Sequence, residues 1–334
     1  MKKFRILPLI AIATLGGMTL PLVSCKKGGD EPEPKPIDPL CFMADGEDST
    51  VSYDAHTLTV GVDGDVDIEV STDKTNWSKW KVQEGTTLGQ VLTINDGQKL
   101  YIRNTKNTLS TNYDNRFQFV MDGKISASGN VNSMINYGEL SKYCFVNLFT
   151  GCTSLTTAPE LPATTLADRC YLCMFLDCTS LETAPELPAT TLANSCYSQM
   201  FNNCESLKNV PSVLPAIELA DGCYSCMFQS CSSLETPPDL PAQTLKYHCY
   251  SDMFSWCSSL IYAPSLPATT LEEASCREMF RGCSTLKVSQ DNGTNLIVDF
   301  TDVDLTLENC VDNMFQGAGG EFQGTPTNAK YFWN

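Results

Sequence analysis

The sequence predicts a mixed fold, in which an N-terminal antiparallel β-sandwich is followed by a coiled array of short repeats. Two observations predict it. Residues 40–132 contain short runs of alternating polar and apolar residues separated by Gly, Asp and Asn, which is typical of antiparallel strands. From residue 143 onward the same residue types return every 26 or 27 residues, and a fixed period of this length indicates a solenoid or another array.

The first residues have the composition of an export signal. A positively charged start precedes a moderately apolar stretch that two adjacent glycines interrupt, so the stretch is too broken for a good membrane span. It ends in LVSC, which resembles the lipobox of bacterial lipoproteins. We therefore expect residues 1–25 to be a signal peptide and Cys25 to carry lipid, because acyl chains anchor a protein by their buried methylenes. Ordinary signal cleavage beside an incidental cysteine is the alternative. Residues 26–39, rich in Pro, Gly and charge, form the predicted flexible tether.

The predicted β-sandwich spans residues 40–132. Five of its segments are rich in strand-forming residues, and no long helical pattern interrupts them. The predicted strands are Leu58–Val62, Val66–Val70, Lys79–Val82, Lys99–Asn104 and Arg116–Met121.

Two functional interpretations of this region compete with plain packing. The acidic run Asp63–Asp67 suggests a calcium loop, but the positions where an EF-hand loop needs Gly and Glu hold Ile68 and Lys74, so the wet face of a strand is favoured. Trp77 and Trp80 suggest an aromatic platform for sugars, whereas core and edge packing is the simpler interpretation.

The repeats occupy residues 133–318 and share three columns of equivalent residues. Because repeats this short cannot bury a face alone, they must stack on one another, and their repeated apolar columns must lie inside. The columns are Phe149, Phe175, Phe201, Phe228, Phe254 and Phe280; Cys152, Cys178, Cys204, Cys231, Cys257 and Cys283; and Leu155, Leu181, Leu207, Leu234, Leu260 and Leu286. Phe315 belongs to a degenerate last copy, and residues 319–334 form the predicted C-terminal cap.

The cysteines decide whether this chain does chemistry. A second cysteine column, in which Ser275 replaces one member, indicates a slot for a small residue rather than an obligatory bond. Cys173 and Cys226 stand in a column that polar residues fill in other copies, so we expect this column to face water. We predict free thiols that serve as packing; disulfides between coils are the main alternative, and a metal site lacks converging ligands and histidines.

The copy CYLCMFLDCTSLETAPELPATTL resembles the BspA-like leucine-rich repeats through Phe175, Cys178, Leu181 and the pair Leu187-Pro188. The resemblance covers about residues 143–288, and the lipobox, tether and sandwich ahead of it resemble surface lipoproteins of Gram-negative anaerobes. It implies a right-handed leucine-rich-repeat solenoid with a parallel sheet on one face and short helical turns on the other. The helical spacing of Cys170–Cys178 and the strand composition of Thr179–Ala184 favour the same arrangement, with prolines ending each strand.

Composition argues against several classes of function. The net charge of −17 repels phosphate backbones, so we expect no nucleic-acid partner. Only two histidines and no recognisable catalytic or phosphate-binding motif are present, so we expect no enzyme and no cofactor or metal.

We predict instead a cell-surface lipoprotein that acts as a non-catalytic scaffold for adhesion to host or matrix proteins, anchored in the outer membrane. The exposed strand positions differ between copies while the core columns do not, which favours a ligand face there. The candidate residues are Glu160, Glu182, Glu186, Lys208, Glu235, Asp239, Ile261 and Tyr262. Solvated strand residues without a ligand are the plain interpretation. The alternative functions are glycan binding, with the sandwich as the reader and the repeats as a spacer, and a purely structural spacer.

Overall fold

The structure is a computed structural model that describes residues 37–56, 67–83, 86–286 and 309–319 of the 334-residue chain. The described residues, from Ile37 onward, belong to one compact unit. The predicted signal peptide with Cys25, most of the tether, the predicted strand Leu58–Val62 and all but the first residue of the predicted cap lie outside the described residues.

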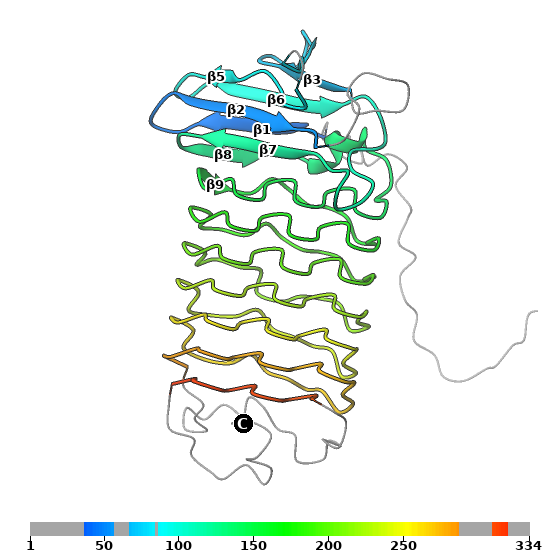
Figure 1. Ribbon diagram of the computed structural model, residues 1–334, viewed down its shortest axis with the longest axis vertical. Coiled ribbons are helices and arrows are strands. Elements are labelled where there is room, and N and C mark those ends of the chain that lie inside the picture. The colour runs from blue at the N-terminus through cyan, green and yellow to red at the C-terminus, as the bar shows by residue number, and fades with distance from the viewer. Residues whose placement is uncertain (1–36, 57–66, 84–85, 287–308, 320–334) are drawn as a thin grey trace, which may run out of the picture. The chain divides into compact units, whose positions relative to one another are not determined.

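Two sheets form the N-terminal part of the described chain (Figure 1). In the larger sheet the order is β4 (Ser78–Lys79), β3 (Ile68–Ser71), β6 (Lys99–Asn104), β1 (Leu40–Ala44), β8 (Ile125–Ser128) and β9 (Leu155–Thr157). In the smaller sheet the order is β5 (Leu92–Ile94), β2 (Ser49–Asp54) and β7 (Gln118–Asp122). Neighbouring strands are antiparallel except β8 and β9, which are parallel.

Aromatic side chains fill the space between these two sheets. Burial alternates along β2, as expected of a strand with one face in a core. Phe42 of β1 meets Phe119 of β7 edge to face with ring centroids 4.9 Å apart, which joins the larger sheet to the smaller one. Tyr53 of β2 packs between Phe117 and Trp80 with centroids 4.8 and 5.0 Å away, and its hydroxyl donates to the Trp80 carbonyl.

One short 3₁₀ helix, η1 (Val131–Ile135), connects the sheets to the repeats. The side chain of Asn130 caps it by accepting the N–H of Asn132 at 2.8 Å, which satisfies a backbone donor at the helix start. The buried hydroxyl of Ser133 accepts the N–H of Leu40 and donates to the carbonyl of Ile102, so η1 is fixed to the larger sheet.

The predicted fold class is wrong, because the described part of the chain is nearly all sheet and turn and has no α-helix. Cys170–Cys178, expected to be helical, is a run of turns. The N–H of Met174 turns back to the carbonyl of Tyr171 at 3.2 Å, whereas the N–H of Phe175 reaches the carbonyl of Met200 in the next repeat at 2.9 Å. Alternate N–H groups therefore bond between repeats, and no i→i−4 helical ladder forms.

Left-handed residues explain why this spacing does not produce a helix. Every fourth residue of the turn segment has positive φ, as at Arg169, Cys173 and Asp177 with φ of 53°, 54° and 61°. An α-helix needs right-handed φ throughout, so these residues break it at each step. The apolar period of about four residues that resembles a helix is the period of these turns instead.

Beyond the first copy, the predicted strands are also absent from the repeats that the structure describes. Only β9 is a strand among those residues, and Thr179–Ala184 contributes two isolated parallel bridges, both at Thr183, to Thr157 and to Asn209. The N–H of Leu181 turns back to the Cys178 carbonyl at 3.0 Å, and proline follows at 185. The segment between turn and proline is too short for a ladder. A leucine-rich-repeat solenoid of short strands and short helices is thus not what this chain forms.

Residues of the sheets take the place of a repeat at the start of the stack. The ring of Phe119 stacks on Phe149 with centroids 5.2 Å apart, and the N–H of Phe119 donates to the Leu148 carbonyl at 2.8 Å. Strand β8 pairs in parallel with β9. Strands β7 and β8, which follow each other in the chain but belong to different sheets, therefore cover the open face of the first repeat, and the sheets and repeats share one continuous core.

Two aromatic ladders run through the repeats. Consecutive phenylalanines from Phe149 to Phe315 stack with centroids 5.2 to 5.7 Å apart, and Phe145 begins a second ladder of four tyrosines spaced 5.7 to 6.0 Å. These spacings suit offset stacking. Each repeat thus buries its rings against the next, as the sequence columns predict.

Candidate functional site

The cysteines form two interior columns that alternate with the aromatic ladders. All sixteen described cysteines are free thiols, and all but Cys226 are buried. In the column that follows each Phe by three residues, the thiol donates to the carbonyl of the Phe in the preceding repeat, at 3.1 Å for both Cys178 and Cys204. These thiols act as small packing groups with one weak hydrogen bond.

Burial makes these thiols poor nucleophiles. It raises the pKa of Cys144 and of Cys196 to about 12, and it raises the pKa of Cys178 well above the usual value of a thiol. Since the thiolate is the reactive form, these groups are chemically quiet at neutral pH. Their position supports a structural role.

The prediction that the column of Cys173 and Cys226 faces water is wrong. Cys173 is buried, Cys226 is half-buried, and Asn147 and Glu278 in the same column are also buried. The residues of this column have positive φ, which turns their side chains back against the stack. The negative charge of the buried Glu278 is balanced by ion pairs of its carboxylate with the guanidinium groups of Arg277 and Arg281, at N–O distances of 3.2 and 2.5 Å.

The predicted ligand face is a strip of exposed residues along the stack. Seven of the eight candidates are exposed: Glu160, Glu182, Glu186, Lys208, Glu235, Asp239 and Tyr262. Ile261 is half-buried. The backbone brings successive members side by side, since the N–H of Lys208 donates to the Glu182 carbonyl at 3.0 Å and that of Ile261 to the Glu235 carbonyl at 3.1 Å. We call these eight residues the variable strip.

A polar hollow of about 440 Å³ adjoins the start of this strip. Glu182 is the one candidate residue that lines it; the others come from the β7–β8 turn, the loop before β2 and the first three repeats: Glu47, Gly123, Lys124, Thr153, Ser154, Thr156, Ser180 and Ser206. Lys124 pairs with Asp45 at 2.9 Å. The hydrogen bond to Asp45, with the charges of Asp45 and Glu182, raises the pKa of Lys124 and keeps it cationic. The hollow therefore offers a cation, carboxylates and several hydroxyls.

Sequence reasoning missed this hollow because its two halves lie far apart in the chain. Lys124 lies in the turn between β7 and β8, whereas the serines belong to the repeats and have the composition of ordinary loop residues. The signal that marks the hydroxyls is their recurrence: Ser154, Ser180 and Ser206 hold the position just before the buried leucine in three successive repeats.

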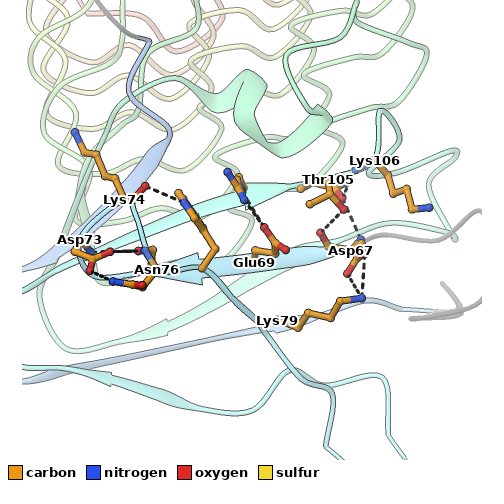
Figure 2. A network of polar contacts seen from close by, with 12 residues as sticks. Asp67, Glu69, Asp73, Lys74, Asn76, Lys79, Thr105 and Lys106 are labelled. Atoms are coloured by element: carbon orange, nitrogen blue, oxygen red, sulfur yellow. Dashed lines mark hydrogen bonds and ion pairs between the residues drawn. The ribbon is translucent and has the colours of Figure 1, made fainter.

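The acidic residues next to the disfavoured calcium loop that the structure describes are engaged in ion pairs (Figure 2). Residues 63–66 lie outside the described part. Asp67 pairs with Lys79 at 3.1 Å, and Glu69 of β3 accepts two hydrogen bonds from Arg103 of β6. For Asp67 and Glu69, the wet face of a strand is the correct interpretation.

Trp77 and Trp80 do not form the aromatic platform that was weighed against packing. Trp80 is only 4 % exposed and donates its indole N–H to the Gln90 carbonyl. The guanidinium of Arg103 lies over the ring of Trp77, 4.1 Å from its centroid. Trp80 therefore packs in the core and Trp77 packs at the edge, which is the simpler of the two interpretations.

Among the described residues, no three His, Cys, Asp or Glu side chains are grouped to hold a metal ion, and no helix there is long and apolar enough to cross a bilayer. No protein-family model, no curated protein and no solved structure matches the chain.

Proposed function

We propose that this chain is a non-catalytic binding protein, displayed at the cell surface by a lipid on Cys25, that holds a protein ligand along its variable strip. The observation that carries the proposal is the contrast between the two sides of each repeat. The interior positions repeat as Phe, Cys and Leu, whereas the exposed positions of the strip change from copy to copy. A stack that served only as a spacer would not need this individuality.

The chemistry of the strip favours a basic ligand. Glu182 and Glu186 are exposed acids of one repeat, and Glu235 and Asp239 are exposed acids of the repeat two further along, with Lys208 in the repeat between them; the whole chain carries a net charge of −17. Such a field attracts a cationic segment and speeds its encounter. Tyr262, 41 % exposed at the far end of the strip, adds an amphipathic ring of the type that anchors protein interfaces.

The proposal is tested by reversing charge on the strip. The probe is an array of peptides tiled from extracellular-matrix proteins, read with the soluble chain from residue 37 onward. Glu182, Glu186, Glu235 and Asp239 are changed to Lys together, and we expect loss of capture on the basic peptides that bind the parent chain. The control changes four exposed acids outside the strip, Asp122, Glu139, Glu218 and Glu273, and so has the same net charge. Equal losses in both variants, or no capture by the parent chain, would refute the strip.

The anchorage has its own test. In the native host, the parent chain should partition into the detergent phase of a detergent phase separation, because acyl chains supply its attachment to the membrane. The Cys25→Ala variant should partition into the aqueous phase instead. Protease treatment of intact cells should release peptides of the repeats only when Cys25 is present. Retention of the Cys25→Ala variant in the membrane would contradict lipid anchorage.

A further inference from the structure

Trp256 lies apart from the variable strip and is the most exposed of the described tryptophans. Its side chain is 53 % exposed, whereas Trp80 is buried and Trp77 is half-covered. It stands two residues after Phe254, in the column that Asp177, Asn203 and Ser230 hold in earlier repeats. An exposed indole in a column otherwise filled by glycine and small polar residues needs a reason.

Gly282 shows that the next repeat is shaped to receive this indole. Gly282 follows Trp256 in the same column and has φ of 71°. The conformation alone does not demand glycine, since Asn203 and Ser230 adopt φ of 60° at the equivalent positions. Space demands it: a Cβ on Gly282 would lie 2.5 Å from Cε3 of Trp256 and 2.8 and 2.9 Å from the two adjoining ring atoms, Cδ2 and Cζ3.

These distances also fix the orientation of the ring. If the Cβ position lies directly above Cε3, its distances to Cδ2 and Cζ3 are nearly equal and only slightly longer than its distance to Cε3, as observed here. If it lay in the plane of the ring, its distances to Cδ2 and Cζ3 would be clearly longer than its distance to Cε3. One face of the indole therefore lies flat against the backbone of Gly282. Gly151, in the same column, has nothing within 4 Å of its Cβ position, so this close approach is particular to Trp256.

The ring lies in a hollow of about 560 Å³, which we call the Trp256 hollow. Its other lining residues are small or polar: Ser258, Arg281, Gly282, Ser284, Gln316 and Gly317. The guanidinium of Arg281 lies 5.8 Å from the ring centroid and is oriented by Glu278, which accepts a hydrogen bond from one of its terminal nitrogens. The hollow thus combines a half-exposed indole with serine hydroxyls and with a guanidinium that lies over the ring.

We propose that the Trp256 hollow binds a pyranose ring of a neutral oligosaccharide. One face of a pyranose presents C–H groups, which pack on the electron-rich face of an indole, while its hydroxyls point sideways toward hydrogen-bonding groups. Arg281, Ser258 and Ser284, which line the same hollow, are the hydrogen-bonding groups available to such hydroxyls. The volume falls within the range of about 300–1,000 Å³ that small-ligand sites have.

A protein partner fits this hollow less well than a sugar. A stable protein interface buries about 800 Å² on each side and uses several large anchors. Here a single large apolar side chain is surrounded by Gly, Ser, Gln and Arg. The site lies outside the variable strip, so it adds a second ligand class to the proposed function and does not depend on it.

The test is isothermal titration of the chain from residue 37 onward with cellohexaose, laminarihexaose, mannohexaose and chitohexaose, and with an oligogalacturonate as an acidic comparison. We expect at least one neutral hexasaccharide to bind. Trp256→Ala should weaken its Kd by at least about tenfold, a loss of about 1.4 kcal/mol. Tyr247→Ala, which removes an exposed ring outside both the variable strip and the Trp256 hollow, is the matched control and should leave the Kd unchanged.

Gly282→Asn provides a second variant that keeps Trp256 in the chain. Asn203 shows that the column accepts Asn at this φ, so the repeat should still fold, but the new side chain displaces the indole from its seat. We expect a similar loss of sugar binding with an unchanged melting temperature of the stack. The proposal is overturned if none of the neutral oligosaccharides binds, if the oligogalacturonate alone binds, if binding survives Trp256→Ala, or if Trp256 proves necessary only for capture of a protein.

Discussion

The Sγ atom of Cys178 lies 3.1 Å from the carbonyl oxygen of Phe149, one repeat earlier in the stack. The same oxygen also accepts the N–H of Cys152 at 3.0 Å. A carbonyl oxygen has two lone pairs, and the thiol of Cys178 donates to the second one. The relationship recurs down the column at Cys204, Cys231, Cys257 and Cys283. Cysteine at this position therefore fills a small apolar space and donates a weak hydrogen bond to a backbone carbonyl. This packing role explains why cysteine recurs in each repeat without forming disulfides.

This role predicts a moderate cost for removing one thiol. Cys178→Ala leaves a small cavity and deprives the Phe149 carbonyl of one weak donor, and we expect the free energy of unfolding to fall by about 1–2 kcal/mol. Cys226→Ala, at a half-buried thiol, should change it by less than about 0.5 kcal/mol. Urea unfolding followed by circular dichroism measures both values. Equal effects at the two positions would contradict the packing role of the Phe-linked column.

The thiols should also be countable. After denaturation without reductant, alkylation and mass spectrometry should find every described cysteine from Cys41 to Cys310 in the thiol form. In the native protein Cys226 should be alkylated first among them, because it is the only half-buried one. If fewer than about half of the thiols were free after denaturation, disulfides between repeats would replace the packing account.

The raised thiol pKa values predict how stability depends on pH. Burial raises the pKa of Cys144, Cys196 and Cys276 from 9.0 to about 12 in the folded chain. A group whose folded pKa is raised favours the folded state fully below its unfolded pKa, and this contribution is lost as the pH rises toward the folded pKa. We expect the unfolding free energy to fall steadily between pH 9 and 12 under reducing conditions. A variant with these three residues changed to Ala should show a shallower fall; an identical slope would contradict the assignment to thiols.

Tyr171 is expected to gain stability when its hydroxyl is removed. The hydroxyl oxygen is buried and has no hydrogen-bond partner among the described residues, and burial raises the pKa of this phenol well above its usual value. The preceding member of the same ladder is Phe145, stacked 5.7 Å away, so the column accepts a plain ring. Tyr171→Phe should raise the unfolding free energy by up to about 1 kcal/mol, because a buried unpaired polar group is costly. A lower melting temperature would show that the hydroxyl is satisfied.

The sequence was informative where one residue type must be buried in every copy. The Phe, Cys and Leu columns lie inside as predicted, because apolar burial depends only on spacing and residue type. The local backbone was predicted wrongly at Cys170–Cys178. Residues with positive φ such as Arg169 and Cys173 have no side-chain signature, so the turn period of about four residues could not be distinguished from a helical period.

The candidate sites were predictable to a smaller extent. The residues of the variable strip could be predicted, because they are the positions that differ between copies while the apolar columns stay the same. Seven of the eight are exposed in the structure. The hollow at Lys124 and the Trp256 hollow depend on contacts between separate copies or between sheet and repeat, which a single copy does not encode. The segment of β7 and β8 was not predicted to cover the first repeat, because Phe119 is not followed by the cysteine and leucine that mark the later copies.

Two glycines with nearly the same φ predict opposite responses to a side chain. Gly129 has φ of 74°, and a Cβ there would collide with the carbonyl of Pro39, where the chain pairs alongside Asn130. Gly151 has φ of 72°, nothing lies within 4 Å of its Cβ position, and Asn203 holds the same column at φ of 60°. Gly129→Ala should lower the unfolding free energy by more than about 2 kcal/mol, since a backbone carbonyl cannot move aside cheaply. Gly151→Asn should stay within about 0.5 kcal/mol of the parent chain, because the repeat already accommodates Asn there and a non-glycine residue reduces the entropy of the unfolded chain. Thermal and urea unfolding of the two variants measure both effects, and a large loss at Gly151 would show that φ alone, and not the space around the residue, sets the demand for glycine in this stack.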